Sequence, residues 1–233
     1  MPLSKKNPTK QEFENFYEKS NPWNADGIFS DLVRQRILRK VFANKAFDRG
    51  IDIACGEGYV TSRLNFVKDK FGVDISETAV NRARKKYKNV CFVSGDAFKN
   101  KVIDGEFDFI SCFEALYYPT LDEERKNALR NLLNYGSNKS IYTYSVVTIG
   151  ENKHRRYFTK KEFIEMLIEV GYKVDGVYGF VLGGKHSSVT FRIIRKAISI
   201  LLPRSLSESL YAFITMNASD SNIYQHLFVC RKN

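Results

Sequence analysis

The strongest constraint on the fold of this chain is a regular alternation of short apolar runs with helical patterns, which begins near Arg49. The apolar runs span residues 51–55, 71–75, 90–95, 107–113, 140–147 and 172–180. The helical patterns span residues 59–67, 76–87, 121–133 and 159–170. Strand and helix in turn are typical of β-α-β crossovers, which build a parallel sheet with helices on both faces. We therefore expect an α/β fold around one mostly parallel sheet.

Two helices are expected before this alternation begins. Thr9 and Glu12 have the spacing of a capping box, which predicts a helix that starts just after Thr9. A second helix is expected from about Ile28 to Ala43, after a break at Asn21-Pro22. These two helices would form an N-terminal cap.

The length of 233 residues suits one well-packed domain. Near its end, a helical insertion over about residues 188–217 precedes a last strand over about 222–232. We expect a single domain over residues 1–233. Its parts are the helical cap 1–45, the core 46–180, the helical insertion or lid 181–222 and the final strand 223–233.

The turn between the first strand and the following helical pattern, IDIACGEGYVTSRL, raises the question of what it binds. A dinucleotide turn carries three glycines as GxGxxG and closes on a pyrophosphate. Gly56 and Gly58 supply the first two, but Thr61 stands where the third would be. A phosphate-binding P-loop would need a Gly-Lys-Ser/Thr ending, which is absent. Neither phosphate-binding interpretation fits this turn.

Acidic side chains follow the strands around this turn. Asp52 precedes the turn, Asp74 ends the second strand, and Asp96 follows the third strand. The carboxyl ends of adjacent parallel strands meet in the crevice where such sheets bind ligands. Carboxylates suit a ligand that carries an ammonium, a ribose and an adenine with no phosphate between them. S-adenosylmethionine is such a ligand.

On these residues the sequence resembles the class I S-adenosylmethionine-dependent methyltransferases over about residues 48–180, although Ala54 stands where their glycine-rich turn often begins with glycine. The resemblance implies a Rossmann-like seven-stranded methyltransferase sheet with an antiparallel last strand. It also implies S-adenosyl-L-methionine as cofactor and S-adenosyl-L-homocysteine as product. No metal is expected.

The same resemblance assigns roles to individual cofactor residues. Asp52, Ala54, Gly56 and Gly58 would form the turn beside the methionine portion, with Phe113 next to it. The adenosine portion would be held by a second group of residues, in which Asp74 accepts from the ribose, Ile75 packs on the adenine, and Asp96 and Ala97 meet its amino edge.

Two further stretches carry a more specific resemblance. Residues 16–23, FYEKSNPW, and residues 107–133 are similar to the nodulation-type sugar N-methyltransferases and neighbouring small-molecule methyltransferases. This resemblance implies an N or O atom of a small acceptor, such as a sugar, a nucleotide-linked sugar or a glycolipid, as the methylated group.

Candidate catalytic residues lie at two loops. Glu114, directly after the fourth strand, could orient or deprotonate the acceptor, or could be an exposed loop acid. His154, after the fifth strand, is a second candidate base, and a solvated loop histidine is the alternative.

Aromatic and basic residues near these loops are candidates for contacts with the ligands. Tyr17 and Trp23 could close the cap over the cofactor or simply anchor it to the core. Tyr117 and Tyr118 could wall the acceptor pocket or pack beneath their loop. Arg155 and Arg156, beside His154, could contact the acceptor.

The net charge of +11 points to an anionic partner or to a generally basic solvated surface. From Gly176 to Ser207 the chain has no acidic residue, so a phosphorylated or lipid-linked acceptor, or peripheral contact of residues 188–204 with a membrane, is consistent with it. The alternative for this basic stretch is a solvated helix face. A second group of cations is also expected on a solvated helix face, namely Arg82, Arg84, Lys85, Lys86 and Lys88.

Two other functions fit parts of the sequence. A nucleic-acid methyltransferase would use the basic surface, but residues 112–115 read Cys-Phe-Glu-Ala where base-amino methyltransferases carry Asn/Asp-Pro-Pro-Tyr/Phe. We therefore expect no stable nucleic-acid partner. A protein that binds S-adenosylmethionine without methyl transfer is the other alternative. Four cysteines without CxxC spacing and the lack of a long apolar run predict a cytoplasmic chain, and no oligomeric state follows from the sequence.

Overall fold

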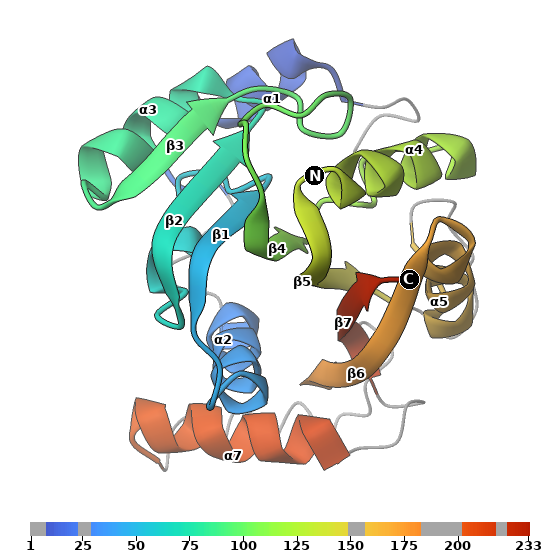
Figure 1. Cartoon of the computed structure of the whole chain (residues 1–233). Helices are drawn as coiled ribbons and strands as arrows, with labels where there is room; N and C mark the ends of the chain where they lie inside the picture. The colour runs from blue at the N-terminus through green and yellow to red at the C-terminus, as the bar shows by residue number, and fades with distance from the viewer. Residues whose placement is uncertain (1–7, 23–28, 149–156, 183–201, 218–222) are drawn as a thin grey trace.

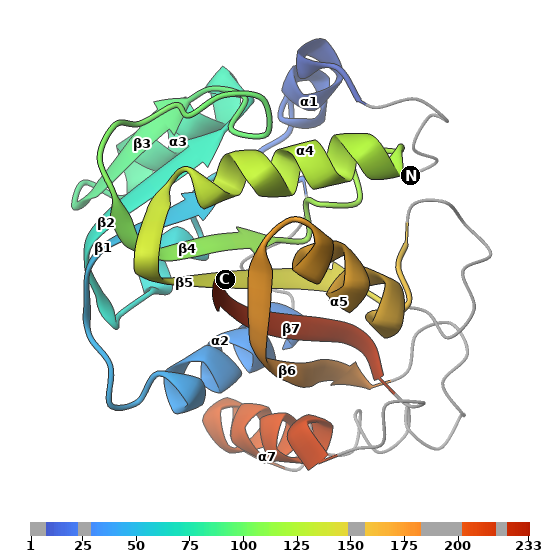
Figure 2. The same ribbon diagram turned by 45° about the vertical axis from the view of Figure 1, so that its right-hand side comes forward.

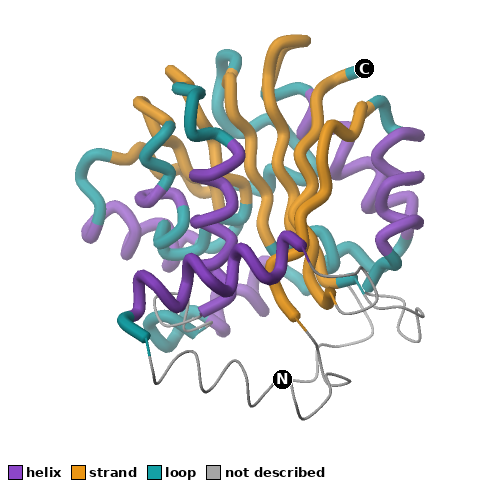
Figure 3. The backbone as a smooth tube through the Cα atoms, turned by 90° about the horizontal axis from the view of Figure 1, so that it is seen from below, coloured by secondary structure: helices purple, strands orange, loops and turns teal. Residues whose placement is uncertain are grey.

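The computed structural model describes residues 8–22, 29–148, 157–182, 202–217 and 223–233. They form a seven-stranded sheet with helices on both sides (Figures 1 and 3). The strands are β1 Phe47–Ile53, β2 Val67–Asp74, β3 Val90–Ser94, β4 Phe107–Phe113, β5 Gly136–Val147, β6 Tyr172–Leu182 and β7 Ile223–Lys232. Their order across the sheet is β3-β2-β1-β4-β5-β7-β6.

The last strand along the chain runs against its neighbours. β7 pairs antiparallel with β5, where Tyr144 faces Phe228, and antiparallel with β6 on its other side. The pairs among β1, β2, β3, β4 and β5 are all parallel. This confirms the expected Rossmann-like methyltransferase sheet, mostly parallel with an antiparallel last strand.

Helices cover the sheet in two layers. The helices described are α1 Lys10–Phe16, α2 Phe29–Val41, α3 Glu77–Lys86, α4 Asp122–Leu133, α5 Lys160–Glu169 and α7 Arg204–Asn217. Helices α2 and α7 pack on one face, α4 and α5 on the other, and α3 packs against β2 and β3 (Figures 1 and 2). Capping boxes begin α1 at Thr9, as predicted, and α5 at Thr159.

The apolar run of β4 shows why strands of this sheet lack polar alternation. Successive residues Phe109 and Ile110 are both fully buried but belong to different core clusters, one under α2 and α7 and one under α4 and α5. A strand with helices on both faces needs apolar side chains on both faces. In β4 only Asp108 is exposed, and the run of five buried residues 109–113 is the sequence mark of that position.

The prediction of a helix over residues 59–67 is wrong. The chain makes a single 3₁₀ turn there, Thr61–Arg63, and β2 begins at Val67 instead of near residue 71. Because β2 takes up these extra residues, little chain remains after the glycine turn to form a helix. Phe66 packs instead among Phe42, Phe47 and Phe109, at ring-centroid distances of 5.1–6.0 Å.

The helical insertion is described only in part. Helix α7 forms its second half, whereas residues 188–201 of the expected insertion lie outside the described residues. Among the residues with described positions, no helix has the length and apolar character needed to cross a membrane.

Candidate functional site

A cavity of about 860 Å³ opens at the carboxyl ends of β1, β2 and β4. The described candidate residues on its wall are Tyr17, Asp52, Ala54, Gly56, Asp74, Ile75, Asp96, Ala97, Phe113, Glu114, Tyr117 and Tyr118. The fold therefore brings these positions together, because the ends of neighbouring parallel strands share one edge of the sheet. Trp23, His154, Arg155 and Arg156 lie outside the described residues.

Asp52 lies beneath the glycine turn with 2% of its surface exposed. Its two carboxylate oxygens accept hydrogen bonds from the hydroxyls of Thr61 and Ser111, each at 2.7 Å. Burial raises the pKa of Asp52 to about 6, against the opposing effect of the two hydroxyls and of Arg34. This acid is held in place from two sides, by the turn and by β4.

The glycine turn needs left-handed backbone at two cavity positions. Gly56 has φ of +55° and Ala54 has φ of +58°, so alanine occupies a conformation that glycine adopts more easily. The N–H of Gly56 donates to Asp74 Oδ2 at 2.8 Å. This bond ties the end of β1 to the end of β2.

Gly58 has a different position from the one expected. It does not line the cavity, and a Cβ there would lie 2.4 Å from the ring of Phe92. Its φ of +77° and this close approach let the turn pack against β3. The geometry thus favours a packing role for Gly58 over the expected contact with the methionine portion.

Asp74 ends β2 with its carboxylate in the cavity wall. Besides the bond from Gly56, its Oδ1 accepts from the N–H of Ser76 at 2.9 Å. Burial raises the pKa of Asp74 to about 6, opposed by these two backbone donors. Each oxygen uses one lone pair in these bonds, so each retains acceptor capacity for a ligand.

The loop after β3 forms the next part of the wall. Asp96 Oδ1 accepts from the N–H of Phe98 at 3.2 Å, and Asp96 pairs with Lys99 at 3.3 Å. Ala97 is buried and packs into the core below. Phe98 also lines the cavity and was not among the candidates, because one aromatic residue in a loop carries no sequence signal.

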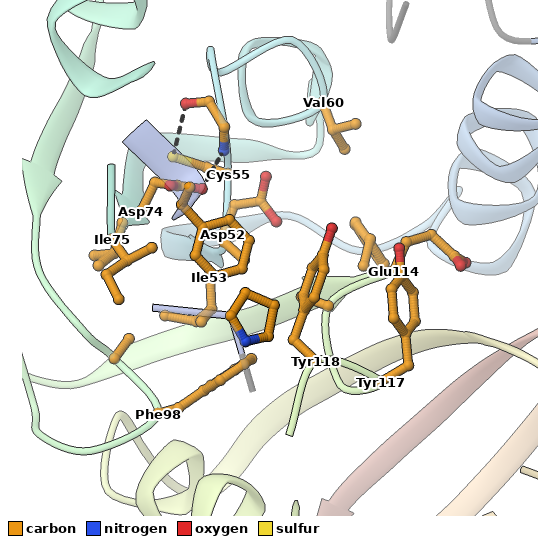
Figure 4. A pocket seen from close by; sticks show the side chains of 18 of the residues that line it. Asp52, Ile53, Cys55, Val60, Asp74, Ile75, Phe98, Glu114, Tyr117 and Tyr118 are labelled. Atoms are coloured by element: carbon orange, nitrogen blue, oxygen red, sulfur yellow. Dashed lines mark hydrogen bonds between the residues drawn. The ribbon is translucent and has the colours of Figure 1, made fainter. Parts of the chain in front are cut away.

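Glu114 lies at the other end of the cavity from Asp52 and Asp74, and Tyr118 lies between them (Figure 4). Its backbone is left-handed, with φ of +55°, which costs energy for a residue other than glycine and is typical of functional sites. Its Oε2 accepts from the amide of Gln225 at 3.3 Å. Its Oε1 is buried and has no hydrogen-bond partner among the described residues. Burial raises the pKa of Glu114, and the nearby Arg34 partly offsets that rise.

Arg34 is a cavity residue that the sequence did not reveal. It projects from α2, is 2% exposed, pairs with Asp31 at 2.9 Å and donates to Ser145 Oγ at 3.3 Å. Its guanidinium also lies 4.5 Å from the ring centre of Phe113. The spacing of Asp31 and Arg34 on one helix face was the available signal, but it is common in solvated helices.

Tyrosines line the end of the cavity near Glu114. The rings of Tyr117 and Tyr118 are 4.7 Å apart, and Tyr157 lies 6.3 Å from Tyr117. Burial raises the pKa of Tyr117 well above its usual range, so it remains a neutral hydroxyl. These tyrosines line the cavity, and their contact with an acceptor stays a prediction.

The N-terminal segment closes one side of the cavity. Tyr17 is buried, and Phe13 packs edge-on against Tyr118 at 4.9 Å. The carboxylate of Glu14 accepts from the backbone N–H groups of Glu77 and Thr78, at 2.7 and 3.2 Å, at the start of α3. The segment is therefore bonded to α3 as well as packed over the cavity.

A second link to the N-terminal segment involves Arg82, which was expected on a solvated helix face. Its guanidinium pairs with Glu57 of the glycine turn at 3.0 Å and donates to the carbonyls of Lys19 and Glu18 at 3.0 and 3.3 Å. Glu57 also accepts from the N–H of Asn21 at 2.9 Å. Arg82 thus links α3, the glycine turn and the N-terminal segment, which corrects that assignment.

Potential metal ligands do not gather in this cavity. Over the described ranges, no group of three or more His, Cys, Asp or Glu side chains is placed to hold a metal ion.

Comparisons with known proteins agree on the type of domain. Residues 51–135 match the family model described as "Methyltransferase domain". No curated protein sequence matches the chain. The match lies over β1 to α4, the part of the chain that supplies Asp52, Asp74, Asp96 and Glu114.

Solved structures share the fold over nearly the whole chain. NodS, an N-methyltransferase from Bradyrhizobium japonicum crystallised with S-adenosyl-L-homocysteine, has a TM-score of 0.68 at 16% identity, over 96% of this chain and 97% of its own. Magnesium protoporphyrin IX methyltransferase from Synechocystis, with bound S-adenosylmethionine, has a TM-score of 0.60 at 13% identity, over 99% and 98%. The [4+2]-cyclase SpnF has a TM-score of 0.58 at 16% identity, over 86% and 80%. The family model and this shared fold confirm the resemblance to class I S-adenosylmethionine-dependent methyltransferases.

Proposed function

We propose that this chain, which has the class I methyltransferase fold, uses S-adenosylmethionine to methylate an N or O atom of a small-molecule acceptor. The observation that carries this proposal is the arrangement of one cavity. Asp52, Asp74 and Asp96 lie at adjacent strand ends around a glycine turn, and Glu114 lies at the opposite end.

The residues present fit this cofactor. The free lone pairs of Asp74 suit two ribose hydroxyls, and the apolar side chains of Ile75 and Phe98 suit an adenine ring. Asp52, ionised near neutral pH, is a counter-charge for the positive methionine portion. The cavity volume of about 860 Å³ is enough for the cofactor together with a small acceptor.

When bound, S-adenosylmethionine supplies a methyl group on a sulfonium sulfur. The thioether that leaves after methyl transfer needs no proton. The protein then has to align the acceptor with the S–CH₃ bond and keep water out. We assign Glu114 to accept the proton of the acceptor, because its side chain lines the cavity and burial raises its pKa. Tyr117 and Tyr118 would orient the acceptor through their rings and hydroxyls.

For the acceptor we propose a sugar, a nucleotide-linked sugar or a glycolipid. Tyrosine rings and carboxylate oxygens are surfaces that bind the C–H faces and hydroxyl or amino groups of sugars. Asp31 and Glu114 together outweigh the single positive charge of Arg34 at this end, which disfavours a phosphate beside the transferred methyl group. Any phosphate of the acceptor would therefore lie farther out.

The test combines binding and turnover. Calorimetry with S-adenosylhomocysteine should give one site per chain, and NAD should not bind. Panels of amino and hydroxy sugars with S-adenosylmethionine should then yield S-adenosylhomocysteine with at least one member. Binding without turnover on broad panels, including tRNA and duplex DNA, would favour a cofactor-binding protein, and turnover on a nucleic acid alone would replace the proposed acceptor.

A further inference from the structure

The outer face of α7 carries an apolar stripe that no described residue covers. Leu206, Leu210 and Phe213 are 56%, 38% and 59% exposed, and their i, i+4, i+7 spacing places them along one side of the helix. The opposite side, with Tyr211 and Ala212, is buried against α2 and β6. We call these three exposed residues the α7 stripe.

The stripe is not part of a general scatter of exposed apolar residues. Only two other large apolar side chains are exposed in the part of the chain that the structure describes, Leu121 and Ile168. They belong to different regions, at the start of α4 and on α5. Isolated exposed residues need no explanation, but three at helical spacing form one continuous surface.

Positive charge lies beside the stripe. Arg36 of α2 donates to the carbonyl of Ser205 in the first turn of α7 at 3.1 Å. Arg39 and Lys40, one turn further along the same side of α2, are exposed. The one acidic residue of α7, Glu208, is 12% exposed and lies 3.9 Å from Arg36.

The adjacent sequence has the same charge. No acidic residue occurs from Gly176 to Ser207. The cations of that stretch are Lys185, Arg192, Arg195, Lys196 and Arg204. The apolar stripe therefore follows a strongly basic stretch of the sequence. Helix α7, which carries the stripe and contacts Arg36 of α2, lies at the bottom of Figures 1 and 2.

We propose that the α7 stripe docks on an anionic membrane surface, with its apolar side chains in the headgroup boundary and the exposed cations of α2, Arg39 and Lys40, against lipid phosphates. An apolar helix face flanked by cations is the pattern of helices that lie in such interfaces. A second copy of the chain fits less well. Three half-exposed side chains offer roughly 300 Å², and a stable dimer buries about 800 Å² on each partner. The proposal goes beyond the methyltransferase function and does not depend on it.

The test is co-sedimentation of the full chain with phosphatidylcholine vesicles that contain or lack phosphatidylserine. Wild type should bind the anionic vesicles at least tenfold more tightly, and binding should weaken as salt rises. The variant Leu206→Ser/Leu210→Ser/Phe213→Ser should lose at least tenfold of that affinity. The matched control Leu121→Ser/Ile168→Ser removes the two other exposed side chains and should bind as wild type.

Folding and self-association are checked on the same proteins. Thermal unfolding and S-adenosylhomocysteine affinity should match wild type in both variants; the single variant Phe213→Ser serves if the triple variant does not fold. Equal binding to both vesicle types, no binding, or an equal loss in the control would overturn the proposal. A concentration-dependent dimer that the triple variant turns into a monomer would instead assign the stripe to a second copy.

Discussion

The hydroxyl of Tyr17 lies 2.7 Å from the place that a Cβ would occupy on Gly56. The N-terminal segment therefore rests directly on the glycine turn, with no room for a side chain between them. The N–H of Gly56 in this turn also donates to Asp74. The segment, the turn and the end of β2 therefore form one connected unit at the proposed cofactor site.

Gly56→Ala should weaken S-adenosylhomocysteine binding at least tenfold in calorimetry. The new Cβ would both meet Tyr17 and force alanine to adopt φ of +55°, which costs about 1–2 kcal/mol. Adding Tyr17→Phe should recover part of the affinity by removing the clashing atom. Gly171→Ala is the control, because φ there is +100° with no atom closer than 3.7 Å. It should cost stability and leave affinity unchanged; wild-type affinity in Gly56→Ala would contradict the geometry.

Affinity for S-adenosylhomocysteine should rise as the pH rises through about 6. Asp74 has its pKa raised to about 6 by burial, and only the ionised carboxylate accepts from two ribose hydroxyls. Calorimetry from pH 5 to pH 8 would measure the change. Asp74→Asn should bind weakly at every pH and lose most of the slope. A flat profile for the wild type would remove Asp74 from the site.

Asp52→Asn should change how stability depends on pH. Its pKa is 3.8 when unfolded and about 6 when folded, so the folded state binds the proton more tightly between these values. The protonated Asp52 therefore adds to the free energy of unfolding below about pH 4. This contribution is lost as the pH rises through 6, and the loss is at most ~3 kcal/mol.

Urea denaturation of both proteins from pH 4 to pH 8 measures this effect, because the difference between them cancels the other titrating groups. Relative to wild type, Asp52→Asn should gain stability toward pH 8. Thr61 and Ser111 can still bond an amide in that position. A stability difference that does not vary with pH would show that Asp52 titrates normally.

Arg82→Ala should speed the dissociation of S-adenosylhomocysteine several-fold. Without the guanidinium, the carbonyls of Lys19 and Glu18 lose their donor and Glu57 loses its ion pair. The bond from Asn21 to Glu57 remains as the link between the segment and the turn. Stopped-flow displacement measures the rate. Lys85→Ala, which removes an exposed charge from the same helix, should dissociate at the wild-type rate. Equal rates in all three proteins would mean that the segment does not retain the ligand.

Glu114→Gln should lower turnover by about 10²-fold or more if this carboxylate removes the acceptor proton. Its affinity for S-adenosylhomocysteine should stay within about twofold, because Glu114 lies at the other end of the cavity from Asp74. The measurement uses an acceptor found in the sugar panel. Wild-type turnover in this variant would exclude Glu114 as the base.

The sequence predicts the sheet well because its signals are local. Each buried strand is a short apolar run, and the acids and glycines of the site follow those runs directly. The same logic failed for residues 59–67, where apolar residues at helical spacing fill a core around Phe66 without forming a helix. Spacing alone does not show how many residues the next strand will take up.

The parts of the site that were not predicted depend on contacts between residues far apart in the sequence. Arg34 and Arg82 look like ordinary surface cations of helices, and only the fold brings one beneath Phe113 and the other to the N-terminal segment. Conversely, Gly58 matches the motif, but its neighbour is Phe92 of β3. A motif defines the turn; the packing around it decides which residue meets a ligand.

The position of β7 has a consequence for synthesis of the chain. Although it comes last, β7 lies inside the sheet, where Tyr142 pairs with Cys230, a partner 88 positions later. Until the ribosome releases β7, β5 exposes an unpaired edge and β6 has no strand to pair with, and unpaired strands are surfaces on which incomplete chains aggregate. A premature stop shortly before Ile223 would therefore leave the five paired strands β3-β2-β1-β4-β5 and a separate β6 without a partner.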